Sequence, residues 1–135
     1  GGMRKISSFF SSRRKSFGYA FAGWWHVIRT QRNAWIHAIV SLLVVIVALY
    51  LNISRQEWAV IILAIAGVWI AEFLNTALEA VVDLATNHAH HELARIGKDV
   101  GAAAVLIAAG AAVLIGLLIL GPPLWAKISR LFSEF

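Results

Sequence analysis

The chain has no cysteine, and charged residues make up only 14% of its 135 residues, whereas 60% are hydrophobic. Without cysteine it can hold no disulfide framework, no thiolate metal site and no cysteine nucleophile. So little polar surface cannot cover a soluble domain of this length, and the composition therefore indicates a membrane protein. In such a chain the net charge of +5 favours contact with anionic lipid headgroups, and we expect no nucleic-acid partner.

Two further features are missing from the sequence. Neither glycine-rich phosphate-binding motif, Gly-x-x-x-x-Gly-Lys-[Ser/Thr] or Gly-x-Gly-x-x-Gly, is present, so no standard nucleotide-binding fold is indicated. The basic N-terminal segment lacks a short apolar core followed by a small-residue cleavage site, and we expect no cleaved signal peptide. Gly1 and Gly2, which precede Met3, resemble a remnant of cloning.

Three segments are apolar enough to cross a hydrocarbon core of about 30 Å, which takes roughly 20 helical residues. They cover residues 34–51, 58–82 and 101–120. The third is followed by Gly121-Pro122-Pro123, which predicts that its helix stops there. Three spans would place the two ends of the chain on opposite sides of the membrane.

The distribution of basic residues predicts the orientation. Nine of them lie before the first span or in the segment 83–100, and three lie on the other side. By the positive-inside rule, the N-terminus and the 83–100 loop are therefore cytoplasmic. Residues 6–30 interleave aromatic and basic side chains, which is typical of an amphipathic helix lying in the membrane interface. Gly18 and Gly23 could divide that helix into two pieces, and a simple anchor is the alternative interpretation.

The second span carries an unusual polar stripe. Glu72, Asn75, Glu79 and Asp83 stand at positions i, i+3, i+7 and i+11, within about 80° of one another on a helix. An ionised carboxylate at membrane depth is costly unless it is paired, hydrated or bound to a metal. The stripe must therefore face a partner helix, a cavity or the cytoplasmic interface, and oligomerisation would bury it.

Depth distinguishes the members of the stripe. At 1.5 Å per residue from Trp58, Glu72 lies about 21 Å down the helix and Glu79 about 32 Å down, near the cytoplasmic headgroups. Glu72 is the more desolvated acid, which suits a general base. Glu79 and Asp83 are better placed to stay ionised and to meet a cation. Asn75, between them, can orient a substrate oxygen or a water.

The segment 83–100, which follows this span, adds acidic and basic side chains on the same side of the membrane. Carboxylates and a lysine beside a membrane suit a polyphosphate held by Mg²⁺, with the lysine meeting phosphate as a point charge. Other interpretations stay open: the acids could hold an oligomer together, the loop histidines could be solvated, and His37 could be an interhelical hydrogen-bonding group. The small residues of 101–112 indicate close helix packing. The segment's polar members are His88, His90, His91, Glu92, Arg95, Lys98 and Asp99.

The segments "EFLNTALEAVVD" (72–83) and "HHELARIGKDVGAAAVLIAA" (90–109) resemble the prokaryotic diacylglycerol kinase family of integral membrane lipid kinases, which includes undecaprenol kinases. The first matches Glu-x-x-Asn-[Ser/Thr]-Ala-[Ile/Leu]-Glu-x-x-Val-Asp throughout, and residues 98–105 match Lys-Asp-x-[Gly/Ala]-Ala-x-Ala-Val. "RNAWIH" (32–37) is similar to the Arg-Asn-x-x-Ile-His stretch of the undecaprenol kinase branch, and "FGYAFAG" (17–23) to the surface-helix segment. The resemblance covers about residues 15–120.

The resemblance implies an all-α homotrimer in the bacterial inner membrane. Each subunit would have three transmembrane helices and an N-terminal amphipathic surface helix, with active sites at subunit interfaces. The implied reaction is Mg²⁺-dependent transfer of the ATP γ-phosphate to the hydroxyl of a membrane lipid alcohol, undecaprenol or diacylglycerol. The implied roles are catalysis for Glu72 and Asn75, metal binding for Glu79 and Gln31, ATP binding for Tyr19, His91, Glu92, Lys98 and Asp99, and contact with the lipid substrate for Glu72, Trp24, Trp25, Asn33 and His37.

One position departs from the family pattern. Gln31 stands where the family usually has a second metal-binding glutamate before Arg-Asn. The amide oxygen of glutamine can still ligate Mg²⁺, but it lacks the negative charge that strengthens the site. A degenerate lipid-binding relative is therefore one alternative. A proton- or cation-conducting membrane oligomer is another, although the one-sided cluster of Glu92, Lys98 and Asp99 counts against it. The "RNAWIH" stretch favours undecaprenol as the lipid, but the sequence leaves the substrate open.

Overall fold

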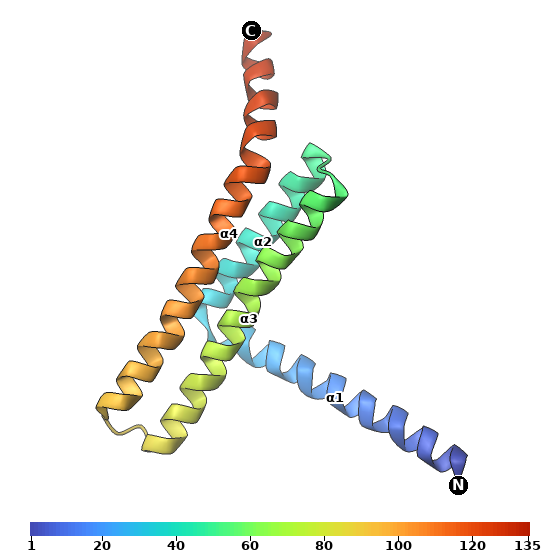
Figure 1. The fold of residues 1–135 in the computed structure, drawn as a ribbon, viewed down its shortest axis with the longest axis vertical. Helices are drawn as coiled ribbons and strands as arrows, with labels where there is room; N and C mark the ends of the chain where they lie inside the picture. Colours follow the sequence, from blue (N-terminus) through green and yellow to red (C-terminus); the bar gives the residue numbers. More distant parts are fainter. The chain divides into compact units, whose positions relative to one another are not determined.

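The computed structural model describes residues 1–135 and contains four α-helices and no strand. The helices are α1 (Gly2–Thr30), α2 (Arg32–Leu51), α3 (Arg55–Thr86) and α4 (Glu92–Ser133) (Figure 1). By length and composition α2, α3 and α4 can each cross a membrane, which confirms the all-α class with three spans. The chain divides into two units, Gly1–Trp35 and Ile36–Phe135, and each is described by itself.

The N-terminal unit consists of α1 and the first turn of α2. Gly18 and Gly23 lie inside α1 without breaking it, so the division into two pieces does not occur. The helix begins at Gly2, ahead of the expected residue 6, and ends at Thr30; the cap residue Gln31 has an extended backbone (φ −106°, ψ 115°). Its aromatic side chains are largely exposed, and its location in the membrane interface stays a prediction.

The connection between α2 and α3 is short, and both of the helix ends that it joins are capped. Asn52 adopts a left-handed conformation (φ 52°) at the end of α2. Ser54 then caps α3: its hydroxyl accepts a hydrogen bond from the Glu57 amide (3.2 Å), and the Glu57 carboxylate accepts one from the Ser54 amide (3.1 Å). This reciprocal arrangement satisfies two helix-end donors. It starts α3 at Arg55, three residues before the predicted span.

The predicted loop 83–100 is in fact mostly helical. α3 continues to Thr86, and α4 begins at Glu92, so only residues 87–91 connect them. Asn87 ends α3 in the left-handed region (φ 50°), where asparagine is tolerated better than most residues. The His91 Nδ1 atom accepts a hydrogen bond from the Leu93 amide (3.1 Å) and caps α4. The loop prediction missed these caps, which extend both helices into the polar segment.

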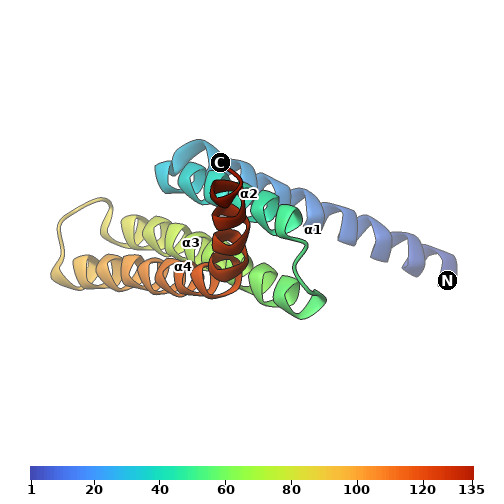
Figure 2. The same cartoon turned by 90° about the horizontal axis from the view of Figure 1, so that it is seen from above.

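The predicted helix stop at Gly121-Pro122-Pro123 is wrong, because α4 runs through both prolines to Ser133. A proline inside a helix removes one hydrogen bond and crowds the preceding turn, which usually bends the helix rather than ending it. The C-terminal part of α4, in red, accordingly leaves the direction of the preceding part in both views (Figures 1 and 2). Lys127 anchors this part, since its ammonium group donates to the Tyr50 carbonyl (3.2 Å) and lies 4.3 Å from the Tyr50 ring centre.

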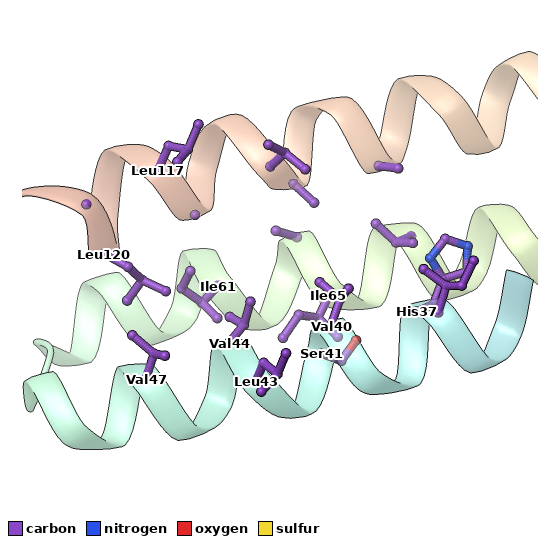
Figure 3. A pocket seen from close by; sticks show the side chains of 18 of the residues that line it. His37, Val40, Ser41, Leu43, Val44, Val47, Ile61, Ile65, Leu117 and Leu120 are labelled. Carbon is purple, nitrogen blue, oxygen red and sulfur yellow. The ribbon is translucent and has the colours of Figure 1, made fainter. Parts of the chain in front are cut away.

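In the unit Ile36–Phe135, α3 and α4 are the helices in closest contact. Between α2, α3 and α4 lies a cavity of about 510 Å³ (Figure 3). Few apolar side chains of this unit are fully covered, namely Ala48, Ile61, Val68 and Leu120. Most of the apolar surface of one copy therefore requires lipid or further copies to cover it, and the homotrimer stays a prediction.

The capping box predicts a measurable contribution to stability. Ser54→Ala removes the hydroxyl that accepts from the Glu57 amide, and we expect a loss of about 1 kcal/mol in the free energy of unfolding. The loss can be measured by denaturant titration in detergent micelles. Ser16→Ala is the matched control, because the Ser16 hydroxyl bonds only to a carbonyl of its own helix, that of Ser12. Equal stability of the two variants would contradict the assigned cap.

Candidate functional site

The buried face of α3 carries an acid in an otherwise apolar environment. Ile61, Val68, Glu72 and Thr76 are its buried residues, and Glu72 is only 1% exposed. Charged side chains at membrane depth almost always face the interior of a bundle or a cavity, and they commonly mark functional sites. Glu72 is therefore the centre of the candidate site: its burial agrees with the expected desolvation, and its catalytic role stays a prediction.

Glu72 meets His37 of α2. The Nε2 atom of His37 lies 3.4 Å from the Oε2 atom of Glu72, and neither atom has a hydrogen-bond partner. The His37 ring stands edge-on to Trp69, with the ring centres 6.1 Å apart. The Trp69 indole in turn donates a hydrogen bond to the Ser41 hydroxyl (3.3 Å). A short series of polar contacts thus joins α2 and α3 at the level of the buried acid.

One turn further along α3, Asn75 faces α4. Its amide nitrogen donates to the Oε1 atom of Glu79 (3.3 Å), and its buried Oδ1 atom has no hydrogen-bond partner. Gly101 of α4 lies directly against that oxygen: a Cβ atom at residue 101 would overlap it and would also lie 3.1 Å from a methyl carbon of Leu78. The expectation of close packing by small residues is therefore confirmed at Gly101, which lets α4 approach the Asn75 side chain.

Near the connection between α3 and α4, the charged groups pair with one another. The Lys98 ammonium lies 2.5 Å from the Asp83 carboxylate and links the two helices. On α4, the Arg95 guanidinium bonds to Glu92 (2.5 Å) and to Asp99 (3.0 Å). The two pairs of Arg95 are exposed, and exposed ion pairs contribute at most about 1 kcal/mol each. They can therefore be exchanged for an anionic ligand at little cost.

The structure brings together part of the predicted set. Glu72, Asn75 and Glu79 follow one another along two turns of α3, and Lys98 reaches the same helix through Asp83. His91 caps α4, and Glu92 and Asp99 are exposed. The remaining predicted residues belong to the N-terminal unit, so their roles stay predictions: Tyr19, Trp24, Trp25, Gln31 and Asn33.

Sequence reasoning missed two contacts, His37 with Glu72 and Gly101 with Asn75. The signal for the first was the register of an antiparallel hairpin. His37 lies fourteen residues before Leu51, and Glu72 lies seventeen after Arg55, so both are at a similar distance from the connection. The second contact had a weaker signal, because several small residues of α4 were equally good candidates.

The donor set of α3 fits a magnesium ion in part. The orphaned Oδ1 atom of Asn75 and the carboxylate of Glu79 are hard oxygen donors on adjacent turns. Mg²⁺ is commonly held by one or two carboxylates, with substrate phosphates and waters completing its octahedron. One copy of the chain gathers no cluster of three or more acidic or histidine side chains. The residues present therefore fit an ion that takes most of its ligands from phosphate and water.

The cavity beside this site is almost entirely aliphatic. His37 and Leu120 lie toward opposite ends of it, and Val40, Val44 and Ile61 line the space between them (Figure 3). The polar side chains in its wall are those of His37 and Ser41. A cavity with one polar end and apolar walls suits the hydrocarbon part of an amphiphile.

Comparison with known proteins identifies relatives of the chain. Residues 18–120 match the family model described as prokaryotic diacylglycerol kinase. A diacylglycerol kinase of Synechocystis sp. is 48% identical over 109 residues, which cover 81% of this chain and 62% of the relative. An undecaprenol kinase of Bacillus subtilis (strain 168) is 44% identical over 110 residues, or 82% of this chain and 89% of the relative. A diacylglycerol kinase of Escherichia coli (strain K12) is 36% identical over 107 residues, or 74% and 81%.

The fold and the buried site define a multi-pass helical membrane protein with a carboxylate at membrane depth. The chain belongs to the prokaryotic diacylglycerol kinase family. The resemblance drawn from the motifs is thereby confirmed. The chain spans less than two thirds of the Synechocystis relative's length, but most of the B. subtilis relative's.

The packing of Gly101 predicts a site-specific effect. Gly101→Ala adds a methyl group where the Asn75 oxygen lies, so we expect Asn75 to move and its hydrogen bond to Glu79 to break. If Asn75 lines the reacting centre, turnover should fall by about tenfold or more, in the range of a misplaced positioning group. Gly110→Ala is the matched control, because nothing lies within 4 Å of a Cβ atom there. Equal turnover of both variants in a phosphoryl-transfer assay would remove Asn75 from the centre.

Proposed function

We propose that the protein transfers the γ-phosphate of ATP to the hydroxyl of a membrane lipid alcohol, undecaprenol or diacylglycerol. The observation that carries this proposal is the burial of Glu72 beside a hydrocarbon-lined cavity, in a chain whose relatives are named lipid kinases. Such a site suits a substrate whose tail stays in the membrane while its hydroxyl reaches a base. The product is the lipid monophosphate, and ADP leaves.

In this reaction Glu72 takes the hydroxyl proton as the lipid oxygen attacks the γ-phosphorus. A positioned general base contributes about 10²–10⁴-fold to the rate. Asn75 orients the reacting oxygen. The hydrocarbon chain of the lipid lies along the cavity, with its hydroxyl end at His37, and the depth of Glu72 supports this placement. Trp24, Trp25 and Asn33 complete the lipid site.

The nucleotide lies on the cytoplasmic side of the base. Glu79 and Gln31 hold Mg²⁺, which neutralises charge on the transferred phosphate when it is bound. Lys98 exchanges Asp83 for a phosphate oxygen, so that one charge-assisted hydrogen bond of its ammonium group replaces another. Contacts with ATP also come from Tyr19, His91, Glu92 and Asp99.

The assembly follows from the same proposal. We infer a homotrimer with its sites at subunit interfaces, which the sparse burial within one copy supports. α1 lies as an amphipathic helix on the cytoplasmic surface of the bacterial inner membrane, and the excess of basic residues on that side supports this orientation. A second copy would also supply the carboxylate ligands that one copy lacks.

A lipid kinase assay tests the proposal directly. In mixed micelles with ATP and Mg²⁺, we expect labelled phosphate to appear on diacylglycerol, undecaprenol or both, and a competition between the two lipids ranks them. Glu72→Gln should reduce turnover by about 100-fold or more, because the amide cannot accept the proton. Glu134→Gln, near the exposed end of α4, is the control. If neither lipid is phosphorylated, the proposed function is wrong. If Glu72→Gln keeps full activity, Glu72 is not the base.

Magnesium dependence tests the metal assignment. Glu79→Ala removes a carboxylate ligand, so half-maximal activity should require about tenfold more Mg²⁺ or beyond, as a lost ligand weakens a hard-cation site. Gln31→Glu adds a charge and should move the requirement in the opposite direction. An unchanged Mg²⁺ titration in both variants would contradict the assigned site.

A further inference from the structure

The contact between His37 and Glu72 also bears on the net charge that is buried at this point of the structure. Their facing atoms lie 3.4 Å apart, the two side chains are 15% and 2% exposed, and neither atom has another partner. An ionised carboxylate without a partner at this depth is strongly disfavoured, whereas an imidazolium and a carboxylate together carry no net charge. His37 is placed to supply the compensating charge.

The charged groups of α3 and α4 that lie between Glu72 and Gly101 in the sequence have partners elsewhere, as follows. On α3, Glu79 accepts from Asn75, and Asp83 pairs with Lys98. On α4, Arg95 binds Glu92 and Asp99, and no titratable side chain occurs from residue 101 to residue 120. On α2, Tyr50 is the sole titratable residue besides His37 between Ile36 and Leu51, and it lies at the far end, beside Lys127. Within the unit Ile36–Phe135, His37 is therefore the partner available to Glu72.

We propose that His37 is a positioning residue that keeps Glu72 ionised at membrane depth, the state in which it can act as a base. This inference rests on the proposed function. In the resting state the imidazolium of His37 faces the carboxylate of Glu72. As the oxygen–phosphorus bond forms and the bond to the ADP oxygen breaks, the hydroxyl proton moves to Glu72 while His37 keeps its own. Glu72 then loses one proton to water, which restores the imidazolium–carboxylate pair. The net proton released is therefore that of the lipid hydroxyl.

The pH dependence of turnover separates this role from packing. In His37→Gln the charge partner is lost, so the ionised form of Glu72 that acts as the base is no longer compensated. We expect turnover near pH 7 to fall by about tenfold or more. The pH of half-maximal turnover should rise by about one unit. The KM for ATP should stay within about twofold, because His37 does not bind the nucleotide.

Two matched variants complete the test. His37→Lys keeps a positive charge and should retain a pH profile close to that of the wild type. His26→Gln replaces an exposed histidine of α1 and should change nothing. Equal losses in His37→Gln and His37→Lys, with an unmoved pH profile, would show a packing role and overturn the proposal. So would wild-type turnover in His37→Gln.

A measurement without turnover covers the case in which the variants do not fold. In bilayers at about pH 8, where an ordinary histidine is neutral, ¹⁵N-histidine-labelled wild-type protein should show one imidazolium signal. Glu72→Gln, which is nearly isosteric, should abolish that signal. Absence of the signal, or its persistence in Glu72→Gln, overturns the pairing even if the kinase assay succeeds. If the wild type phosphorylates no lipid and the signal behaves as expected, the proposed function fails while the charge pairing stands.

Discussion

The cost of a carboxylate in hydrocarbon governs this structure. Insertion scales put a central acidic or basic residue at about 2.5–3.5 kcal/mol, which is large beside the stability of a small domain. Glu72 nevertheless lies on the buried face of α3. The surrounding polar contacts can be understood as responses to that cost. His37 faces the acid, and the neighbouring Trp69 indole is bonded to Ser41.

The three acids of α3 differ in their surroundings along the helix. At Glu72 the environment is dry and one partner is available; at Glu79 the carboxylate is half-buried and shares a hydrogen bond with Asn75. At Asp83 the acid is also half-buried and pairs with Lys98 of the next helix. The buried acid at Glu72 is therefore followed, toward the connection at residues 87–91, by acids that are only half-buried. A lipid hydroxyl and a water-soluble phosphate donor need such a gradient, because each must approach from its own phase.

Sequence reasoning recovered the helical class, the three helices able to span a membrane and the burial of Glu72, because hydropathy and the penalty on buried charge are local properties. It failed at the bounds of the helices and where the outcome depended on geometry between helices. Pro122 and Pro123 predicted an end to α4, but the rest of the helix could continue past a bend. The loop prediction missed the caps at Asn87 and His91. The closeness of Gly101 to Asn75 depends on which face of α4 turns inward, and small residues on several faces concealed that.

The tight connection between α2 and α3 has a consequence for biogenesis. Only three residues, 52–54, separate the two helices, and the acid of one lies level with the histidine of the other. If α3 entered the bilayer alone, it would carry an uncompensated charge into the hydrocarbon. Under the proposed pairing of His37 with Glu72, entry of both helices together as a preformed hairpin delivers the charge already neutralised, which makes co-insertion the less costly route. The capped turn thus does more than join two spans: it holds in proximity the two groups that make the second span insertable.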